Sequence, residues 1–288
     1  MANLGIPRNT IDILQKYQFN FQKKFGQNFL IDTSVLDRII SAAEITKDDC
    51  VLEIGPGIGT MTQYLAESAR EVVAVEIDKN LIPILGETLA EYENVEVVFG
   101  DVLKTDLNAL VREKLDGLRP VVAANLPYNI TTPLLTACVK AGCFASLTVL
   151  IQKEVAQRIC ARSGTADYGA FSLLMQYYTE PELLFTVPNT CFLPMPKVTS
   201  AVIRCTTRAV PPVSVQSEAM LWRTVKAGFA LRRKTLVNSL QTGFPLPKQE
   251  LTQLVADCGL PADIRGERLS LQDYARLSDA VSAAMSEG

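Results

Sequence analysis

The sequence contains no histidine among its 288 residues. This absence excludes Ser-His-Asp and Cys-His nucleophilic triads, metal sites built on two histidines, a histidine general base and a histidine pH switch. Any chemistry of the protein must therefore use carboxylates, amides, hydroxyls, thiols, backbone groups or a cofactor that brings its own reactivity.

Other features are also scarce or missing. The seven cysteines form no Cys-x-x-Cys pair and most have apolar neighbours, which is typical of reduced, buried thiols. No apolar run approaches the ~20 residues that a bilayer requires, and the N-terminus lacks the apolar core of a signal peptide. We therefore expect a cytoplasmic protein that needs neither a membrane nor a metal.

The first two thirds of the chain alternate between short apolar segments and helical patterns. This alternation predicts parallel βαβ units and a doubly wound α/β sheet. Strands are predicted at 50–54, 71–77, 95–99, 120–124 and 147–151, and helices at 60–68, 81–92, 107–115 and 133–141.

The pattern changes after about residue 205. A proline-containing linker at 210–213 precedes three helical segments, predicted at 218–240, 248–258 and 270–285. We therefore expect an N-terminal extension at 1–21, a larger domain at 22–208 and a small all-helical domain at 209–288.

A glycine-rich turn joins the first predicted strand to the following helix, with glycines at 55, 57 and 59. A dinucleotide fingerprint requires a glycine at the sixth place, which here is Thr60, and Pro56 stiffens the turn. The pattern therefore favours a nucleoside cofactor without a pyrophosphate and disfavours an NAD-dependent oxidoreductase. A tight turn without any ligand is the alternative.

Two acidic residues follow at the ends of the next strands. Glu76 lies 21 residues after Gly55, the spacing at which a carboxylate accepts hydrogen bonds from ribose hydroxyls. Asp101 follows the third strand and could accept from the exocyclic amine of an adenine ring. The alternative for each is a solvated acid at a strand end.

The fourth predicted strand ends in Asn125-Leu126-Pro127-Tyr128. The amide oxygen of Asn125 and the backbone carbonyl of Leu126 are two neutral acceptors, which could hold both protons of an exocyclic amine and orient its lone pair. Tyr128 offers a face on which a base can stack. Phe192 is the expected second stacking partner, with a role as a core anchor as the alternative.

Six segments together carry a family resemblance: 24–32, 55–59, 125–128, 192–200, 232–236 and 265–270. Together they resemble the small-subunit (16S) ribosomal RNA adenine N6,N6-dimethyltransferases, the KsgA family, over residues 22 to about 280. The resemblance implies a Rossmann-like class I methyltransferase sheet with a small all-helical C-terminal domain. It also implies S-adenosylmethionine as methyl donor and two adjacent adenosines near the 3′ end of small-subunit rRNA as substrate.

The expected site residues follow from the motifs and the resemblance. The cofactor-binding residues are expected to be Gln27, Asn28, Leu30, Glu53, Gly55, Gly57, Glu76, Ile77, Asp101, Val102 and Asn125. The catalytic residues are expected to be Asn125, Leu126, Pro127, Tyr128 and Phe192. No protein nucleophile and no strong general base is needed, because the sulfonium is electrophilic and the methylated nitrogen loses its proton readily.

The formal net charge of −3 argues against a uniformly basic surface, but three stretches, 13–31, 183–208 and 219–240, lack acidic residues. They supply the expected RNA-binding residues Lys23, Lys24, Lys197, Arg223, Lys226, Arg232, Arg233 and Lys234. On one helix over 218–240, four of these cations would fall within an arc of about 100°. A solvated helix face is the alternative reading.

The expected partner is small-subunit rRNA in an immature 30S-type subunit, bound by a monomer. Two further functions remain open at this point. One is an rRNA-binding assembly factor whose catalysis is incidental. The other is dimethylation of an adenine in large-subunit rRNA.

Overall fold

The computed structural model describes residues 2–115 and 117–287. The chain forms two compact units, one of Met1–Ala156 with Thr179–Thr207 and the other of Gln157–Tyr178 with Arg208–Gly288. The sequence predicts residues 157–178 in the larger domain, but in the structure they pack with the helical unit.

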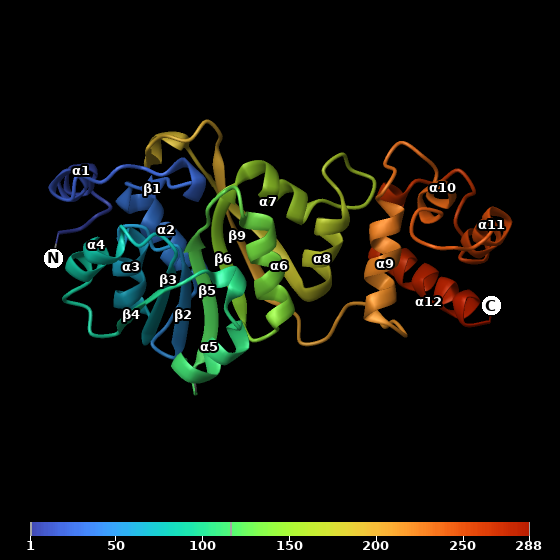
Figure 1. The fold of residues 1–288 in the computed structure, drawn as a ribbon, viewed down its shortest axis with the longest axis horizontal. Helices are drawn as coiled ribbons and strands as arrows, with labels where there is room; N and C mark the ends of the chain where they lie inside the picture. Colours follow the sequence, from blue (N-terminus) through green and yellow to red (C-terminus); the bar gives the residue numbers. More distant parts are fainter. Residues whose placement is uncertain (1, 116, 288) are drawn as a thin grey trace. The chain divides into compact units, whose positions relative to one another are not determined.

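A seven-stranded sheet forms the centre of the first unit, in the order β4-β3-β2-β5-β6-β9-β7. Figure 1 shows the labelled strands side by side in this order, with α5 (Leu107–Lys114) and α6 (Thr131–Ala141) in front of them. The strands are β2 (Asp49–Ile54), β3 (Glu71–Glu76), β4 (Val95–Phe99), β5 (Arg119–Asn125), β6 (Ser146–Gln152), β7 (Thr179–Val187) and β9 (Ser200–Thr207).

Strands β4, β3, β2, β5 and β6 pair in parallel, which confirms the predicted alternating units. Strand β9 pairs antiparallel with both β6 and β7, and the sequence analysis did not predict either β7 or β9. Strand β7 is an edge strand that contains Pro181 and a register shift between Leu183 and Phe185. An edge strand tolerates proline because its outer N–H groups need no partner in the sheet. In the sequence, however, a proline argues against a strand, so Pro181 makes β7 difficult to predict.

One face of the sheet is covered by α2 (Thr33–Ala43) and α3 (Thr60–Ser68). Leu36 and Ile39 of α2 and Leu65 of α3 are completely buried in a cluster with sheet residues such as Val51. Asp32 caps α2 by accepting a hydrogen bond from Val35 N at 3.2 Å. Helix α2 follows the segment 22–31, so the packing of the helix fixes where that segment ends.

The N-terminal segment belongs to the core of the first unit. Leu4 and Leu14 of the segment with α1 (Pro7–Lys16) are buried beside Ile84 and Leu85 of α4 (Ile82–Thr88). Lys16 forms an ion pair with Glu87 at 2.6 Å. Three aromatic rings of the acid-free stretch 13–31, those of Phe19, Phe21 and Phe29, pack against one another at centroid distances of 5.4–5.9 Å.

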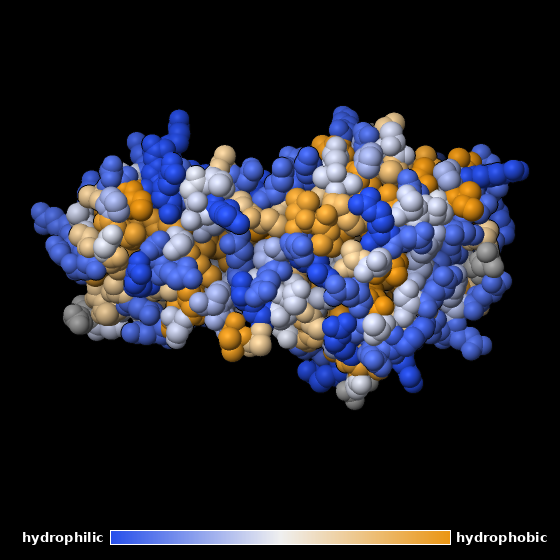
Figure 2. All heavy atoms as spheres, turned by 180° about the vertical axis from the view of Figure 1, so that it is seen from behind, coloured by the Kyte–Doolittle hydropathy of each residue, from blue (hydrophilic) through white to orange (hydrophobic). Residues whose placement is uncertain are grey.

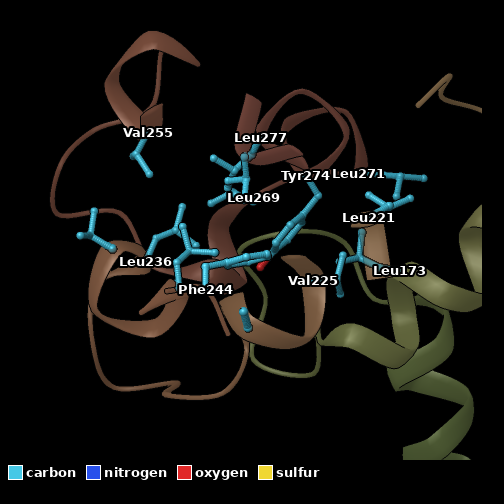
Figure 3. Packing of buried hydrophobic residues seen from close by; sticks show 14 of the residues in the cluster. Leu173, Leu221, Val225, Leu236, Phe244, Val255, Leu269, Leu271, Tyr274 and Leu277 are labelled. Carbon is cyan, nitrogen blue, oxygen red and sulfur yellow. The ribbon is translucent and has the colours of Figure 1, made fainter. Parts of the chain in front are cut away.

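The second unit is helical. Besides α8 (Ala170–Tyr178) it contains α9 (Glu218–Gly228), α10 (Leu236–Leu240), α11 (Lys248–Asp257) and α12 (Leu271–Glu287). Helix α7 (Lys153–Cys160) crosses the boundary between the units. Figure 3 shows the core of this unit, where the ring of Tyr274 lies among Leu173 of α8, Leu221 and Val225 of α9 and Phe244.

The single helix predicted over 218–240 is wrong, because α9 ends at Gly228 and α10 begins at Leu236. Tyr274 and Gly266 pack directly on Gly228. A Cβ built on Gly228 would overlap Tyr274 Oη, and one on Gly266 would overlap the Gly228 carbonyl oxygen. Arg223 and Lys226 therefore lie on α9, whereas Arg232, Arg233 and Lys234 lie in the connection that follows, and no continuous helix carries them all.

Figure 2 shows one face of the molecule, on which hydrophilic residues are spread widely and hydrophobic side chains form separate groups. In the part of the chain that the structure describes, no helix has both the length and the apolar character that crossing a membrane requires.

Candidate functional site

A pocket lies at the carboxyl ends of β2, β3 and β5, covered by the segment 25–30. It encloses about 710 Å³, the open mouth included. Its wall contains the predicted site residues Gln27, Asn28, Leu30, Glu53, Gly55, Gly57, Glu76, Ile77, Asn125, Leu126, Pro127 and Tyr128. The structure thus brings together residues that lie far apart in the sequence.

The wall also contains residues that the sequence analysis missed, namely Phe25, Gly26, Phe29, Pro56, Thr60, Met61 and Leu81. Most of them are apolar residues or glycine, and their side chains carry no functional group that would indicate a binding role. The closeness of Phe29 to the glycine turn, across 28 residues of sequence, is a tertiary contact that no local pattern shows.

The glycine turn depends on backbone conformations that favour glycine. Gly55, Gly57 and Gly59 have φ angles of +70°, +62° and +92°. A Cβ on Gly57 would lie 2.8 Å from the ring of Phe29. Gly57 N donates a hydrogen bond to Glu76 Oε2 at 3.2 Å, so the turn and the end of β3 are connected at the pocket wall.

Glu76 is 4% exposed, and its second oxygen, Oε1, accepts from Asp78 N at 2.7 Å. Burial raises the pKa of this carboxyl to about 7, although the backbone N–H groups of Asp78 and Gly57 favour its charged form. The two N–H groups fix the orientation of the carboxyl group at the pocket wall.

A second carboxyl, that of Glu53, is 1% exposed in the same wall. Burial raises its pKa to about 8, and the nearby Glu76 adds to the rise. Its Oε2 atom and the hydroxyl of Thr60 form no hydrogen bond within the described part of the chain. Buried polar atoms are normally satisfied, so these two atoms are suited to a polar, positively charged ligand in the pocket.

The Asn125 amide has a defined orientation. Its Nδ2 donates to the carbonyl oxygen of Asn28 at 2.8 Å. Because a carbonyl can only accept, the NH2 group must face Asn28, and Oδ1 remains as an acceptor at the wall of the pocket. The neighbouring Leu126 is fixed by its N–H, which donates to the Leu150 carbonyl oxygen at 3.0 Å.

Tyr128 lines the pocket, and its hydroxyl lies 2.6 Å from the hydroxyl of the buried Ser200. Ser200 is the last residue of the predicted motif 192–200, so this contact explains why that motif ends in a hydroxyl residue. Burial raises the pKa of the Tyr128 phenol, which stays neutral.

Three predicted site residues do not line the pocket. Asp101 caps the short helical turn that it precedes, accepting from Leu103 N at 3.0 Å, and Val102 is buried beside it at the end of β4. Phe192 is 2% exposed and lies in the hydrophobic core, where it pairs with Leu30 across a two-stranded sheet. As folded, its ring has no free face for a base, so the structure corrects the predicted stacking role of Phe192.

The predicted RNA-binding residues differ in how they are held. Lys24, Lys197, Lys226, Arg233 and Lys234 are exposed. Arg223 and Arg232 are exposed as well, but each is also held by the protein. Arg223 donates to the Gly243 carbonyl oxygen at 2.7 and 3.1 Å and stacks over Phe244, and Arg232 donates to the Ala166 carbonyl oxygen at 3.2 Å. The side chain of Lys23 lies outside the described part of the structure.

Comparisons with known proteins identify the family of this chain. The family model described as ribosomal RNA adenine dimethylase matches residues 18–281. The ribosomal RNA small subunit methyltransferase A of Lachnoclostridium phytofermentans is 53% identical over 99% of this chain and all of its own length. That of Alkaliphilus oremlandii is 48% identical over 97% of this chain and 98% of its own length.

Solved structures show the same fold. The 23S rRNA methyltransferase ErmE matches with a TM-score of 0.67 and 27% identity, over 88% of this chain and 99% of its own. A dimethyladenosine transferase from Plasmodium falciparum matches with a TM-score of 0.72 and 24% identity, over 86% and 95% of the two chains. From the family match over nearly the whole length and the identity to these relatives, the chain belongs to the ribosomal RNA adenine dimethylase family.

Proposed function

We propose that this protein transfers methyl groups from S-adenosylmethionine to N6 of two adjacent adenosines near the 3′ end of small-subunit rRNA. The product is N6,N6-dimethyladenosine, made in the cytoplasm while the subunit matures. Family membership supports the reaction class, and the names of the relatives support the small subunit. The observation that carries the proposal is the oriented amide of Asn125, which presents Oδ1 at the wall that also holds Glu76 and the glycine turn.

The pocket suits S-adenosylmethionine, which supplies an electrophilic methyl group when bound. The Glu76 carboxylate is placed to accept from ribose hydroxyls, with Gly55 and Gly57 allowing close approach of the backbone. Burial holds protons on Glu53 and Glu76 near neutral pH, and a bound cation would favour their ionised forms, so this wall suits a positively charged ligand. Ile77 lies in the same wall, and Gln27, Asn28 and Leu30 cover it. We propose that Asp101, which lies outside the pocket wall beyond the end of β4, and the neighbouring Val102 contact the adenine end of the cofactor.

The target adenine would lie beside Asn125 and Tyr128. The Asn125 Oδ1 and the Leu126 carbonyl oxygen would each accept a hydrogen bond from the amino group of the adenine. These two bonds would orient the nitrogen lone pair toward the methyl group. Tyr128 provides a stacking face. Methyl transfer leaves N6 positively charged, so the nitrogen loses its proton without a strong base, and no histidine is required.

The exposed cations of the second unit, Lys226, Arg233 and Lys234, are proposed to contact rRNA phosphates together with Lys24 and Lys197 of the first unit. We propose that the unit built on the seven-stranded sheet carries the reaction and that the helical unit binds RNA.

The test is methyl incorporation into small subunits that lack the modification. Asn125→Ala should lower the rate by about 100-fold, the effect of losing an oriented group at a reacting centre. Asn108→Ala, at an exposed position of α5, is the matched control and should leave the rate unchanged. Turnover of Asn125→Ala at the wild-type rate would contradict the role given to Asn125.

Large-subunit rRNA is the competing substrate, since ErmE shares the fold at 27% identity. Incubation of both kinds of subunit in one reaction distinguishes the two, because only the true substrate acquires the label. An assembly factor with incidental catalysis predicts that Asn125→Ala still supports subunit maturation.

A further inference from the structure

Asp78 has no part in the proposed reaction, yet it is one of the most buried acidic residues of the first unit, with 1% of its surface exposed. It lies two residues beyond Glu76 and is absent from the pocket wall. A buried carboxyl group is costly unless its oxygens accept hydrogen bonds. Its partners therefore indicate what it does.

The carboxylate accepts from neutral amide donors of two segments. Gln27 Nε2 donates to Oδ2 at 2.8 Å, and Gln22 Nε2 lies 3.4 Å from both oxygens. Asn80 donates to Oδ1 through its backbone N at 3.1 Å and its Nδ2 at 3.0 Å. Asp78 thus attaches the segment 22–28, which covers the pocket, to the end of β3.

The other end of the Gln27 amide is also fixed, because Gln27 Oε1 accepts from Gln22 N at 2.9 Å. Gln27 is followed by Asn28, whose carbonyl oxygen accepts from Asn125 Nδ2 at 2.8 Å. On the opposite side, Asp78 N donates to Glu76 Oε1 at 2.7 Å. Asp78 is therefore linked by one hydrogen bond to Glu76, the residue proposed to bind the ribose. Through Gln27 and Asn28 it is also linked to Asn125, whose amide is proposed to orient the adenine.

We infer that Asp78 is a positioning residue that couples the cofactor site at Glu76 to the base site at Asn125 through the segment 22–28. This inference rests on the proposed cofactor and adenine roles of those two residues. A carboxylate is required at this position because it accepts only, and every neighbour donates. An asparagine of the same shape would turn an NH2 group toward one of the donors.

The test is a double-mutant cycle on Asp78→Asn and Gln27→Leu in the full-length protein. Calorimetry gives the dissociation constant for S-adenosylmethionine, and methyl incorporation into unmodified small subunits gives kcat and the KM for the subunit. We expect each single change to raise the cofactor dissociation constant about tenfold and to lower kcat, with the KM for the subunit unchanged. The double variant should be no more than about twofold worse than the worse single variant.

The matched control is Asp106→Asn. Asp106 caps α5 with an exposed carboxylate, and asparagine caps a helix equally well, so this variant should behave as wild type. If Asp78→Asn fails to fold, Gln22→Leu takes its place, because Gln22 Nε2 lies 3.4 Å from both Asp78 oxygens and Gln22 is absent from the pocket wall. A wild-type dissociation constant and kcat for that variant would overturn the inference.

Additive effects of the two changes would overturn the inference, since Asp78 and Gln27 would then act separately. A wild-type dissociation constant and kcat for a folded Asp78→Asn, or for Gln27→Leu, would overturn it as well. The proposed function itself fails in a different way, in that the wild-type protein would not bind S-adenosylmethionine at all.

Discussion

The hydroxyl of Tyr128 lies 2.6 Å from the hydroxyl of Ser200, and this bond joins two motifs that are 72 residues apart in sequence. Ser200 is completely buried at the start of β9, whereas Tyr128 lines the pocket. The antiparallel strand that local sequence patterns do not reveal therefore supports the stacking surface. The hydroxyl of Tyr128 fixes the position of the side chain through Ser200, and its ring is the part that would stack on the base.

This division of roles gives a prediction for two variants. Tyr128→Ala should lower kcat/KM for the small subunit by about 10- to 100-fold, because base stacking contributes roughly 1–3 kcal/mol. Tyr128→Phe keeps the ring and loses only the bond to Ser200, so its kcat/KM should stay within a few-fold of wild type. Equal losses in both variants would show that the hydroxyl, and not the ring, is what matters.

A second prediction concerns pH. The pKa of Glu53 is raised to about 8 and that of Glu76 to about 7, from a usual value of 4.5. Between pH 4.5 and these values the folded protein holds protons that the unfolded chain has lost, so its stability should fall as pH rises through this window. A bound cation favours the carboxylates, so S-adenosylmethionine should bind more tightly as pH rises from about 6 to about 8.

Calorimetry in two buffers of different ionisation enthalpy measures the number of protons released on binding. We expect release near neutral pH and a smaller release in Glu53→Gln, which cannot ionise at that position. Proton uptake, or a dissociation constant independent of pH, would contradict the assignment of these two carboxyls to the cofactor site.

The glycine turn provides a third prediction. Gly57 and Gly142 have similar positive φ angles of +62° and +67°, but a Cβ on Gly57 would meet Phe29 whereas one on Gly142 has nothing within 4 Å. Gly142→Ala should therefore cost only the backbone strain, about 1 kcal/mol of unfolding free energy. Gly57→Ala should cost more, up to about 3 kcal/mol, and should also weaken cofactor binding.

Denaturant unfolding and cofactor calorimetry on both variants supply the comparison. If Gly57→Ala were no more destabilised than Gly142→Ala and bound the cofactor normally, the close packing of Phe29 on the turn would be disproved.

A fourth prediction concerns the end of α9. Gly228→Ala would place a Cβ that overlaps Tyr274 Oη in the core of the helical unit, whereas Gly169 has open space around it. We expect a lower thermal midpoint for Gly228→Ala than for Gly169→Ala, because overpacking a core typically costs about 1–3 kcal/mol. Equal midpoints would mean that Tyr274 moves aside freely.

A fifth prediction separates RNA binding from stability. Arg233 and Lys234 are exposed, so replacing both with alanine should weaken binding to immature small subunits without lowering the thermal midpoint. The slope of log K against log salt concentration should become shallower by about one for each phosphate that the variant no longer neutralises. Arg223→Ala should lower the midpoint as well, because Arg223 binds the Gly243 carbonyl and stacks on Phe244.

An unchanged salt dependence in the Arg233 and Lys234 double variant would place the RNA on another surface.

Much of this architecture is predictable from the sequence because the informative features are local. The strand and helix alternation, the glycine turn and the acids at strand ends each depend on a few consecutive residues, and parallel strands bring their carboxyl ends to one edge. The family resemblance is confirmed by the match over residues 18–281. The features that were predicted wrongly or missed depend on contacts between segments that are distant in the sequence.

Three examples show this limit. The helix predicted over 218–240 ends at Gly228 because Tyr274 and Gly266 occupy the space beside it. Phe192 is buried because β8 (Phe192–Leu193) pairs with β1 (Phe29–Leu30). Asp78 gains the amides of Gln22 and Gln27 as partners only when the segment 22–28 folds over the end of β3.

The reaction proposed for this protein is the dimethylation of two adjacent adenosines near the 3′ end of small-subunit rRNA. The most direct measurement is mass spectrometry of that rRNA end after incubation of unmodified small subunits with labelled S-adenosylmethionine and the protein. Wild type should give two neighbouring N6,N6-dimethyladenosines, and Asn125→Ala should give neither. A label on large-subunit rRNA instead, or on no RNA, would contradict it.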